Sequence, residues 1–327
     1  MRWLLPENIE DILPAEAARI EKLRRAILDL FFRNRYELVI PPLLEYTDSL
    51  LTGTGRDLEL RTFKVVDQLS GRMMGLRADI TPQVARIDAH LLNRRGVTRL
   101  CYCGSVLHAR PATPAASREP IQIGAEIFGD AGVAADLEVL SLLCQSLETA
   151  GVRGARVDIG HVAVFRSIVQ QAAIGAELEG ELFEALQKKD VPALKQLTRK
   201  FSAATRNAIL LLPELYGGTE VLALAERKLP PIPGLTRALA TLRKLSGACR
   251  IRASFDLAEL RGYHYHSGVV FDAYCDGVGG AVGFPVARGG RYDEIGKAFG
   301  RARPATGFSI DLRSLASAKL NGKKKRQ

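Results

Sequence analysis

The chain has 327 residues, 47% hydrophobic and 25% charged, so it can bury a sizeable core and has the composition of a globular protein. No apolar run approaches the roughly 20 residues that a membrane-spanning helix needs, and the first residues lack the layout of a secretory signal. We therefore expect a cytoplasmic protein without a membrane partner. The net charge of +10 includes a basic run at 323–326, which predicts a disordered basic tail at 319–327.

The first half of the chain alternates helices with short strands. Residues 14–35 have apolar positions at helical spacing, with Pro14 in the first turn, and an apolar strand-like run broken by Pro41 and Pro42 follows. The alternation at 60–68 and 71–82 predicts antiparallel strands. A helix is predicted at 82–95, then two strands flanking a loop rich in Pro, Ala and Thr, a helix at 134–151, and a strand that runs into a further helix near 165.

The second half begins with helices and returns to strands. From 164 to 246 the apolar period is helical throughout, and strands resume at 250–260, 261–275 and 283–295. A single antiparallel sheet interrupted by a helical insertion is an α+β architecture. We therefore divide the chain into a core at 1–163 and 247–318 and a helical insertion at 164–246.

The five cysteines are odd in number and have no framework spacing, which predicts reduced thiols. Cys101 and Cys103 share a strand face, as do His264 and His266. Neither pair has a further ligand nearby in sequence, so packing or ligand contact is favoured over metal binding. We expect no metal and no cofactor.

Six segments resemble those of histidyl-tRNA synthetases, and they come in the same order: DILPAEA to YELVIPPLLEYTD, LRADITPQVAR, QIGAEIFG, ELRGYHYHSGVVFDAY, ARGGRYDEI and PATGFSIDL. The first resembles the class II motif whose helix and strand end in a proline at the dimer interface. The resemblance covers nearly the whole chain, including a helical insertion. It implies a class II aminoacyl-tRNA-synthetase-like antiparallel sheet flanked by helices.

The nucleotide-handling motifs depart from this pattern. Class II synthetases hold the α-phosphate of ATP with an arginine in an FRxE motif, where preorganised positive charge stabilises the transition state. An ungapped match puts His108 at that arginine and Arg110 at the glutamate. In the third motif Arg313 comes one place early and Ser314 stands at the arginine position. The synthetases also continue into an anticodon-binding domain, whereas this sequence ends at Gln327, so we expect neither tRNA charging nor a tRNA partner.

The amino-acid side of the pocket is kept. In the resembling enzymes, acidic and hydroxyl groups hold the ammonium group of histidine, a Gln and Glu pair with tyrosines binds its imidazole, and arginines lie nearby. The positions that match, and that we take as candidate ligand-pocket residues, are Asp79, Thr81, Arg118, Gln122, Glu126, Arg261, Tyr265, His266 and Tyr292.

Part of this pocket is altered, and part has an alternative interpretation. The tyrosine pair of the synthetases is Tyr265 and His266 here, and their usual aspartate is His264. Outside the motif context, Gln122 and Glu126 would be ordinary strand residues that end in solvent. The identity of the ligand therefore stays open at this point.

A synthetase-like core with displaced ATP arginines resembles the regulatory subunits of ATP phosphoribosyltransferase, which are histidyl-tRNA-synthetase paralogues without aminoacylation activity. The resemblance implies a non-catalytic subunit that a short-form catalytic subunit needs for activity at the first step of histidine biosynthesis. It also implies feedback inhibition with histidine as effector, and a homodimer within a hetero-octamer. Whether histidine binds the ancestral pocket or a subunit interface stays open.

Two other classes of function remain as alternatives. An enzyme that forms amino-acid adenylates for an acceptor other than tRNA would need working ATP contacts, which the displaced arginines oppose. A synthetase-derived RNA-binding protein is favoured mainly by the net charge of +10, and it would bind with strong salt dependence.

Overall fold

The computed structural model describes residues 3–53, 55–111, 113–114, 116–263, 265–278 and 285–318. His264 and the tail expected at 319–327 lie outside the described residues. Within these ranges, no helix combines the length and the apolar composition needed to cross a bilayer.

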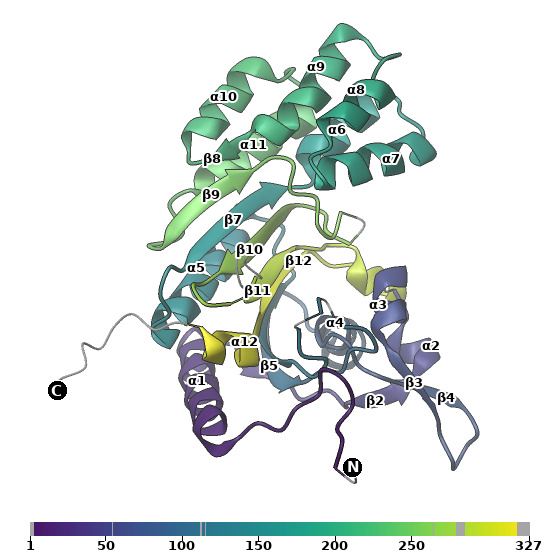
Figure 1. Cartoon of the computed structure of the whole chain (residues 1–327), viewed down its shortest axis with the longest axis vertical. Coiled ribbons are helices and arrows are strands. Elements are labelled where there is room, and N and C mark those ends of the chain that lie inside the picture. The colour runs from purple at the N-terminus through teal and green to yellow at the C-terminus, as the bar shows by residue number, and fades with distance from the viewer. Residues whose placement is uncertain are drawn as a thin grey trace, which may run out of the picture.

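A nine-stranded sheet forms the centre of the molecule (Figure 1). In spatial order its strands are β1 (Glu37–Leu38), β5 (Thr98–Ser105), β6 (Ile121–Phe128), β12 (Ala305–Asp311), β11 (Ala287–Arg291), β10 (Val269–Tyr274), β7 (Arg156–His161), β9 (Arg252–Asp256) and β8 (Tyr216–Gly217). The pairings from β5 to β7 are all antiparallel, whereas β1 with β5 and β7 with β9 are parallel. The α+β architecture predicted from the alternation is confirmed, with parallel pairs added at both margins.

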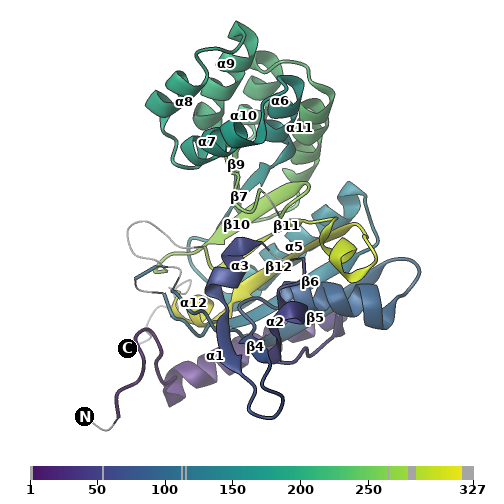
Figure 2. The ribbon, with the colours of Figure 1, turned by 90° about the vertical axis from the view of Figure 1, so that its right-hand side faces the viewer.

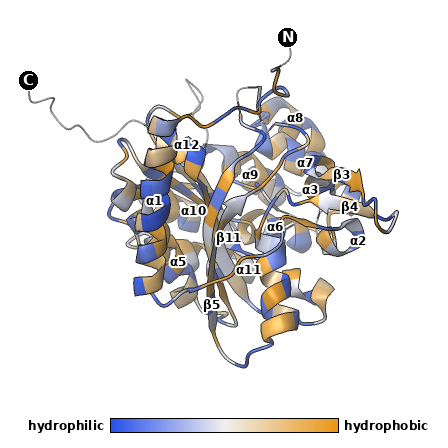
Figure 3. Ribbon diagram, turned by 90° about the horizontal axis from the view of Figure 1, so that it is seen from below, coloured by the Kyte–Doolittle hydropathy of each residue, from blue (hydrophilic) through white to orange (hydrophobic). Residues whose placement is uncertain are grey.

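One face of the sheet is covered by α1 (Pro14–Arg33), α5 (Val133–Ala150) and α12 (Leu312–Ser317). Helix α1 begins at Pro14, whose fixed φ suits a first turn, and it buries Ile20, Ile27 and Phe31 along one side. Figure 3 shows hydrophilic and hydrophobic residues side by side on this helix. The ring of Phe31 meets Phe308 of β12 edge-on, with centroids 5.8 Å apart. The helix is therefore fixed to the sheet by its apolar stripe.

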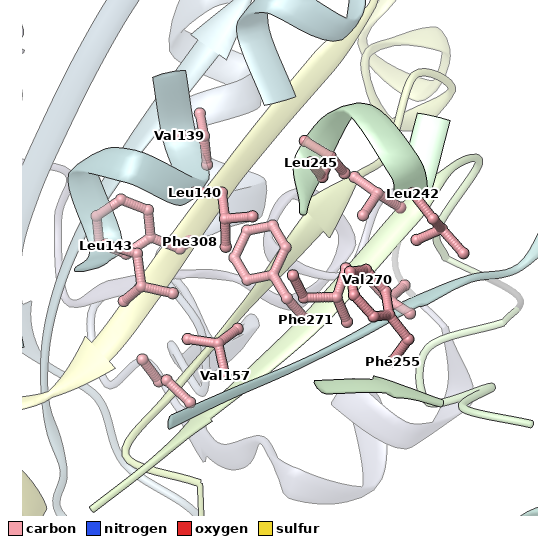
Figure 4. Close-up of a cluster of buried hydrophobic side chains, with 14 of the residues drawn as sticks. Val139, Leu140, Leu143, Val157, Leu242, Leu245, Phe255, Val270, Phe271 and Phe308 are labelled. Carbon is pink, nitrogen blue, oxygen red and sulfur yellow. The ribbon is translucent and has the colours of Figure 1, made fainter. Parts of the chain in front are cut away.

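The same core continues along the sheet without a break (Figure 4). Leu140 and Leu143 of α5, Phe271 of β10, and Leu242 near the end of the helical segment belong to one buried cluster. Each aromatic or branched side chain of this kind contributes about 1.5–3 kcal/mol when fully buried. The helical segment and the sheet are therefore held by one hydrophobic core, and the division into a core and an insertion stays a prediction.

The opposite face of the sheet carries a smaller layer that positions the site. It contains a three-stranded antiparallel sheet and short helices, visible in Figure 2. Its elements are β2 (Leu44–Tyr46), α2 (Thr47–Leu50), α3 (Arg56–Arg61), β3 (Phe63–Val66), β4 (Met73–Leu76), α4 (Thr81–Arg86) and a π-helical turn at Ile87–Leu92. Because side chains alternate along a strand, Cys101 faces α1 and α5 while Leu100 and Tyr102 face α4.

Between β7 and β9 the chain forms a group of helices at one end of the sheet (Figure 1). They are α6 (Ala163–Gln171), α7 (Ala176–Gln187), α8 (Val191–Leu197), α9 (Ala203–Leu211), the 3₁₀ turn Leu212–Glu214, α10 (Glu220–Lys228) and α11 (Pro233–Leu245). A parallel pair such as β7 and β9 needs a long crossover, which these helices provide. The expectation of helix throughout 164–246 was wrong at β8, a two-residue strand that pairs with β9 and is too short to interrupt the helical period.

The expectation of five reduced thiols was also wrong. Cys144 of α5 and Cys249, which precedes β9, form a disulfide with Cα atoms 5.8 Å apart, and Cys101, Cys103 and Cys275 are free. The two bonded residues lie 105 positions apart in sequence, so no local spacing could have signalled the pair. The fold brings them together where α5 packs beside the loop that returns to the sheet.

This pairing can be tested by counting thiols. In denaturant without reductant, three of the five cysteines should react with a maleimide, and all five should react after reduction. In the Cys249→Ser variant every remaining thiol should react in both conditions, because the partner of Cys144 is gone. Mass spectrometry gives the count, and five reactive thiols in the unreduced wild type would contradict the disulfide.

Candidate functional site

A cavity of about 230 Å³ lies between the main sheet and the α3–α4 layer. Strands β6, β11 and β12 form its floor, the turn before α4 and the end of α3 lie on one side, and the loop before β10 closes another. Its lining residues are Arg61, Ala78, Asp79, Thr81, Gln122, Glu126, Tyr265, His266, Arg288, Gly289, Gly290, Tyr292, Gly307, Phe308 and Ser309.

Glycines in the floor make room for polar side chains. Gln122 and Glu126 lie four residues apart on β6 and therefore share one face of the sheet. Gly307 of β12 is the register partner of Glu126, and a Cβ there would stand 1.5 Å from a carboxylate oxygen of Glu126. Gly124 lies between Gln122 and Glu126 on β6. It leaves space for the ring of Tyr102 to lie across the strand, because a Cβ at Gly124 would stand 2.4 Å from that phenol.

Glu126 is the most deeply buried acid of the cavity, with 1% of its surface exposed. Its carboxyl accepts hydrogen bonds from Thr81 Oγ1 at 3.2 Å, from Tyr102 Oη at 3.2 Å, and from Tyr292 Oη. Burial raises its pKa to about 8, although these hydroxyl donors act in the opposite direction; the charge of nearby Asp79 raises it further. Near pH 7 this carboxyl is therefore largely protonated.

Two tyrosines and a histidine form the aromatic wall. The rings of Tyr265 and Tyr292 stack with centroids 5.3 Å apart, and His266 meets Tyr265 edge-on at 5.2 Å. Burial raises the pKa of both phenols and lowers that of His266 to about 4, so all three are neutral. Tyr265 Oη is buried and has no hydrogen-bond partner among the described residues. A buried hydroxyl without a partner is costly, and a bound ligand with a polar atom would satisfy it.

The acidic turn before α4 forms the more open side of the cavity. Asp79 is partly exposed, and its Oδ1 accepts from the backbone N–H of Thr81 at 3.0 Å. Gln122 Oε1 accepts from the backbone N–H of Ile80 at 3.0 Å, which ties β6 to this turn. The bonds fix Asp79 beside the mouth of the cavity, where a carboxylate suits a cationic ligand group.

The structure brings seven of the nine candidate residues together and leaves two outside the lining. The guanidinium of Arg118 lies 4.9 Å from the centre of the Phe63 ring, and its Nε donates to the carbonyl of His108 at 3.0 Å. Arg261 pairs with Asp272 and donates to Tyr274 Oη at 3.2 Å. Both arginines are held by neighbours beside the cavity.

The displaced motif arginines also lie outside the lining. Arg110 is exposed, and Arg313 donates to Ser117 Oγ at 3.2 Å, which fixes the loop before β6. Two other arginines line the cavity instead, and neither was predicted from the sequence: Arg61 at the end of α3 and Arg288 on β11. Arg288 lies within the ARGGRYDEI segment, so the motif match could have identified it. Arg61 belongs to none of the six resembling segments and carried no such signal.

The fold and the cavity define a class II synthetase core of the histidyl type. The family model described as histidyl-tRNA synthetase matches residues 8–315. The crystal structure of an ATP phosphoribosyltransferase regulatory subunit/histidyl-tRNA synthetase from Bacillus halodurans C superposes with a TM-score of 0.86 at 28% identity, covering 98% of this chain and 83% of that one. The crystal structure of a histidine–tRNA ligase subunit from Alicyclobacillus acidocaldarius superposes with a TM-score of 0.76 at 27% identity, covering 96% of this chain and 96% of that one.

Sequence relatives narrow this class. The chain is 60% identical over 317 residues to the ATP phosphoribosyltransferase regulatory subunit of Ralstonia pickettii (strain 12J), covering 96% of this chain and 80% of that protein. It is 59% identical to the regulatory subunit of Thiobacillus denitrificans, covering 97% of this chain and 98% of that one. The chain belongs to the family of ATP phosphoribosyltransferase regulatory subunits.

The raised pKa of Glu126 predicts a pH-dependent stability. Its pKa is about 8 in the fold and near the ordinary 4.5 when unfolded, so the folded chain holds the proton more tightly. The stability from the neutral carboxyl is present below about pH 4.5 and is lost as pH rises through about 8. The Tm of Glu126→Gln should therefore fall less than that of the wild type between about pH 5 and about pH 9.

Thermal unfolding across this pH range measures the effect. Glu148→Gln is the matched control, because Glu148 is exposed on α5 and the substitution is the same. Its Tm should follow the wild type at every pH. Parallel pH profiles for Glu126→Gln and the wild type would show that Glu126 ionises normally.

Proposed function

We propose that this regulatory subunit is non-catalytic, that it activates a short-form ATP phosphoribosyltransferase catalytic subunit in the cytoplasm, and that histidine inhibits the complex by binding the cavity. The observation that carries the proposal is the buried polar cavity on a regulatory-subunit fold, with Tyr265 Oη unpartnered among the described residues. A ligand that binds the inhibited and active states with different affinity shifts the equilibrium between them.

The cavity suits one histidine molecule in size and in polarity. Its volume of about 230 Å³ is below the roughly 300–1,000 Å³ of sites for drug-sized ligands. Thr81, Tyr102 and Tyr292 donate to Glu126. The protonated carboxyl still offers its own O–H to an imidazole nitrogen, and the ionised form offers a fourth acceptor site to an imidazole N–H. The hydroxyl of Tyr265 offers a further donor. Asp79 supplies the negative charge for the ammonium group.

The positions of the motif arginines support a non-catalytic role. Adenylate formation needs positive charge at the phosphate, yet His108 stands at the second-motif position with its pKa lowered to about 4 by burial and by nearby Arg61. Arg110 and Arg313 lie outside the cavity lining. We therefore assign the transferase chemistry to the catalytic partner.

Assembly through the first motif is part of the proposal. Around Pro41 and Pro42 the surface exposes apolar side chains, among them Ile40 at 80% and Leu43 at 44%. Exposed apolar groups at the segment that resembles a dimer interface favour a homodimer through this surface. With catalytic subunits, such dimers would form the hetero-octamer that the family resemblance implies.

The activation can be measured by mixing this chain with a short-form catalytic subunit from the same organism. Phosphoribosyl-ATP formation should rise on mixing and fall again when histidine is added, whereas this chain alone should form no product. The catalytic subunit alone, with and without histidine, is the control. Equal rates with and without this chain, together with no co-purification, would contradict the proposed activation.

Histidine binding in the cavity can be tested with Glu126→Gln. The amide loses the charged acceptor for the imidazole N–H, so the affinity for histidine should fall roughly tenfold at pH 8. Thermal unfolding of Glu126→Gln at the same pH verifies that the variant is folded, so that unfolding does not explain the loss. Calorimetry measures the affinity, with Glu148→Gln as the matched control. Unchanged affinity in Glu126→Gln would place the histidine site elsewhere.

A further inference from the structure

Backbone hydrogen bonds join the end of α3 to the segment around His108, which matches the second class II motif. Thr62 forms an isolated antiparallel bridge with His108, and the backbone N–H of Ala109 donates to the carbonyl of Arg61 at 2.8 Å. These contacts hold the backbone of Arg61 beside His108. Arg61 therefore enters the cavity from a different element than the arginine that class II synthetases use.

The His108 ring orients the Arg61 side chain. His108 is 5% exposed. Its Nε2–H donates to the carbonyl oxygen of Ala78 at 3.0 Å, so Nδ1, 3.3 Å from Nη2 of Arg61, is the nitrogen that accepts from the guanidinium. Burial and the neighbouring guanidinium lower the pKa of this imidazole and keep it neutral, so it positions Arg61 without adding a charge of its own. Because Ala78 precedes Asp79, the contacts place the guanidinium next to the acidic turn.

We infer that Arg61, positioned by His108, binds the α-carboxylate of an amino-acid ligand while Asp79 binds its ammonium group. The inference rests on the proposed function, in which an amino acid occupies the cavity. The carboxylate and ammonium group of an amino acid share one carbon atom, so their partners must lie close together. Arg61 and Asp79 both line the cavity, and the contacts of His108 with Arg61 and Ala78 link them. A guanidinium matches a carboxylate with two parallel N–H donors.

Arg61 is favoured over the second cavity arginine. Arg288 is exposed and lies 3.7 Å from a carboxylate oxygen of Asp272, which also pairs with Arg261. Arg288 therefore lies in the Arg261–Asp272 ion-pair network, whereas Arg61 is positioned next to the acidic turn by His108. Glu126 is more deeply buried than Asp79 and largely protonated near pH 7, so it suits the imidazole of the ligand. The charges thus define an orientation, with the α-carbon at Arg61 and Asp79.

The test compares histidine with histamine, which keeps the imidazole and the ammonium group and lacks the carboxylate. Calorimetry on the full chain should show that the wild type binds histidine roughly tenfold more tightly than histamine. Arg61→Met should remove this difference by weakening histidine alone. Arg61→Lys keeps the positive charge but lacks the two parallel N–H donors, so it should retain part of the difference in affinity between histidine and histamine. His108→Leu should weaken histidine selectively, and His108→Gln, which keeps an acceptor, should do so less.

Lys64→Met is the matched control, because Lys64 lies three residues along the chain in an exposed ion pair with Glu59. Its affinities should equal those of the wild type, and thermal unfolding verifies that each variant is folded. Unchanged histidine affinity in both Arg61 variants, or equal losses for histidine and histamine, would overturn this inference and leave the proposed histidine site standing. A wild type that binds neither ligand would overturn both.

Discussion

The candidate site depends on one constraint, which is that a carboxyl group is buried within the sheet at Glu126. A buried acid needs hydrogen-bond donors, and Thr81, Tyr102 and Tyr292 supply them from α4, β5 and the segment after β11. It also needs space, which Gly307 provides on the neighbouring strand. Elements that lie far apart in sequence must therefore meet at the carboxyl group of Glu126. The cavity lies beside this carboxyl group.

The sequence predicted those parts of the structure that depend on local order. The sequence pattern was enough to predict β6 as a strand, the family resemblance was enough to name Gln122 and Glu126, and the order of the motifs was enough for the class of fold. The site was harder, because a side chain's direction depends on neighbours that no motif contains. Arg118 and Arg261 match family positions, yet Phe63 and Asp272 hold them beside the cavity.

Compared with the synthetase motifs, the arginines that line the cavity come from other positions, whereas seven of the nine candidate pocket residues line it. A neutral His108 stands where the synthetases place an arginine, and the nearest guanidinium comes from α3. The residue at the second-motif position is therefore uncharged, and the positive charge beside it comes from Arg61. Under the proposed function, this cavity binds an amino acid without activating it, which is what a sensing site requires.

The disulfide between Cys144 and Cys249 has an entropic consequence. It joins two points of the chain that lie shortly before β7 and shortly before β9, the parallel pair that brackets the helical segment. In the unfolded oxidised chain the disulfide already holds the segments of β7 and β9 close together. Pairing these strands therefore closes a short loop through the disulfide instead of a long loop through all the helices between them. Because the entropic cost of closing a loop grows with its length, the disulfide lowers the entropic cost of pairing β7 with β9.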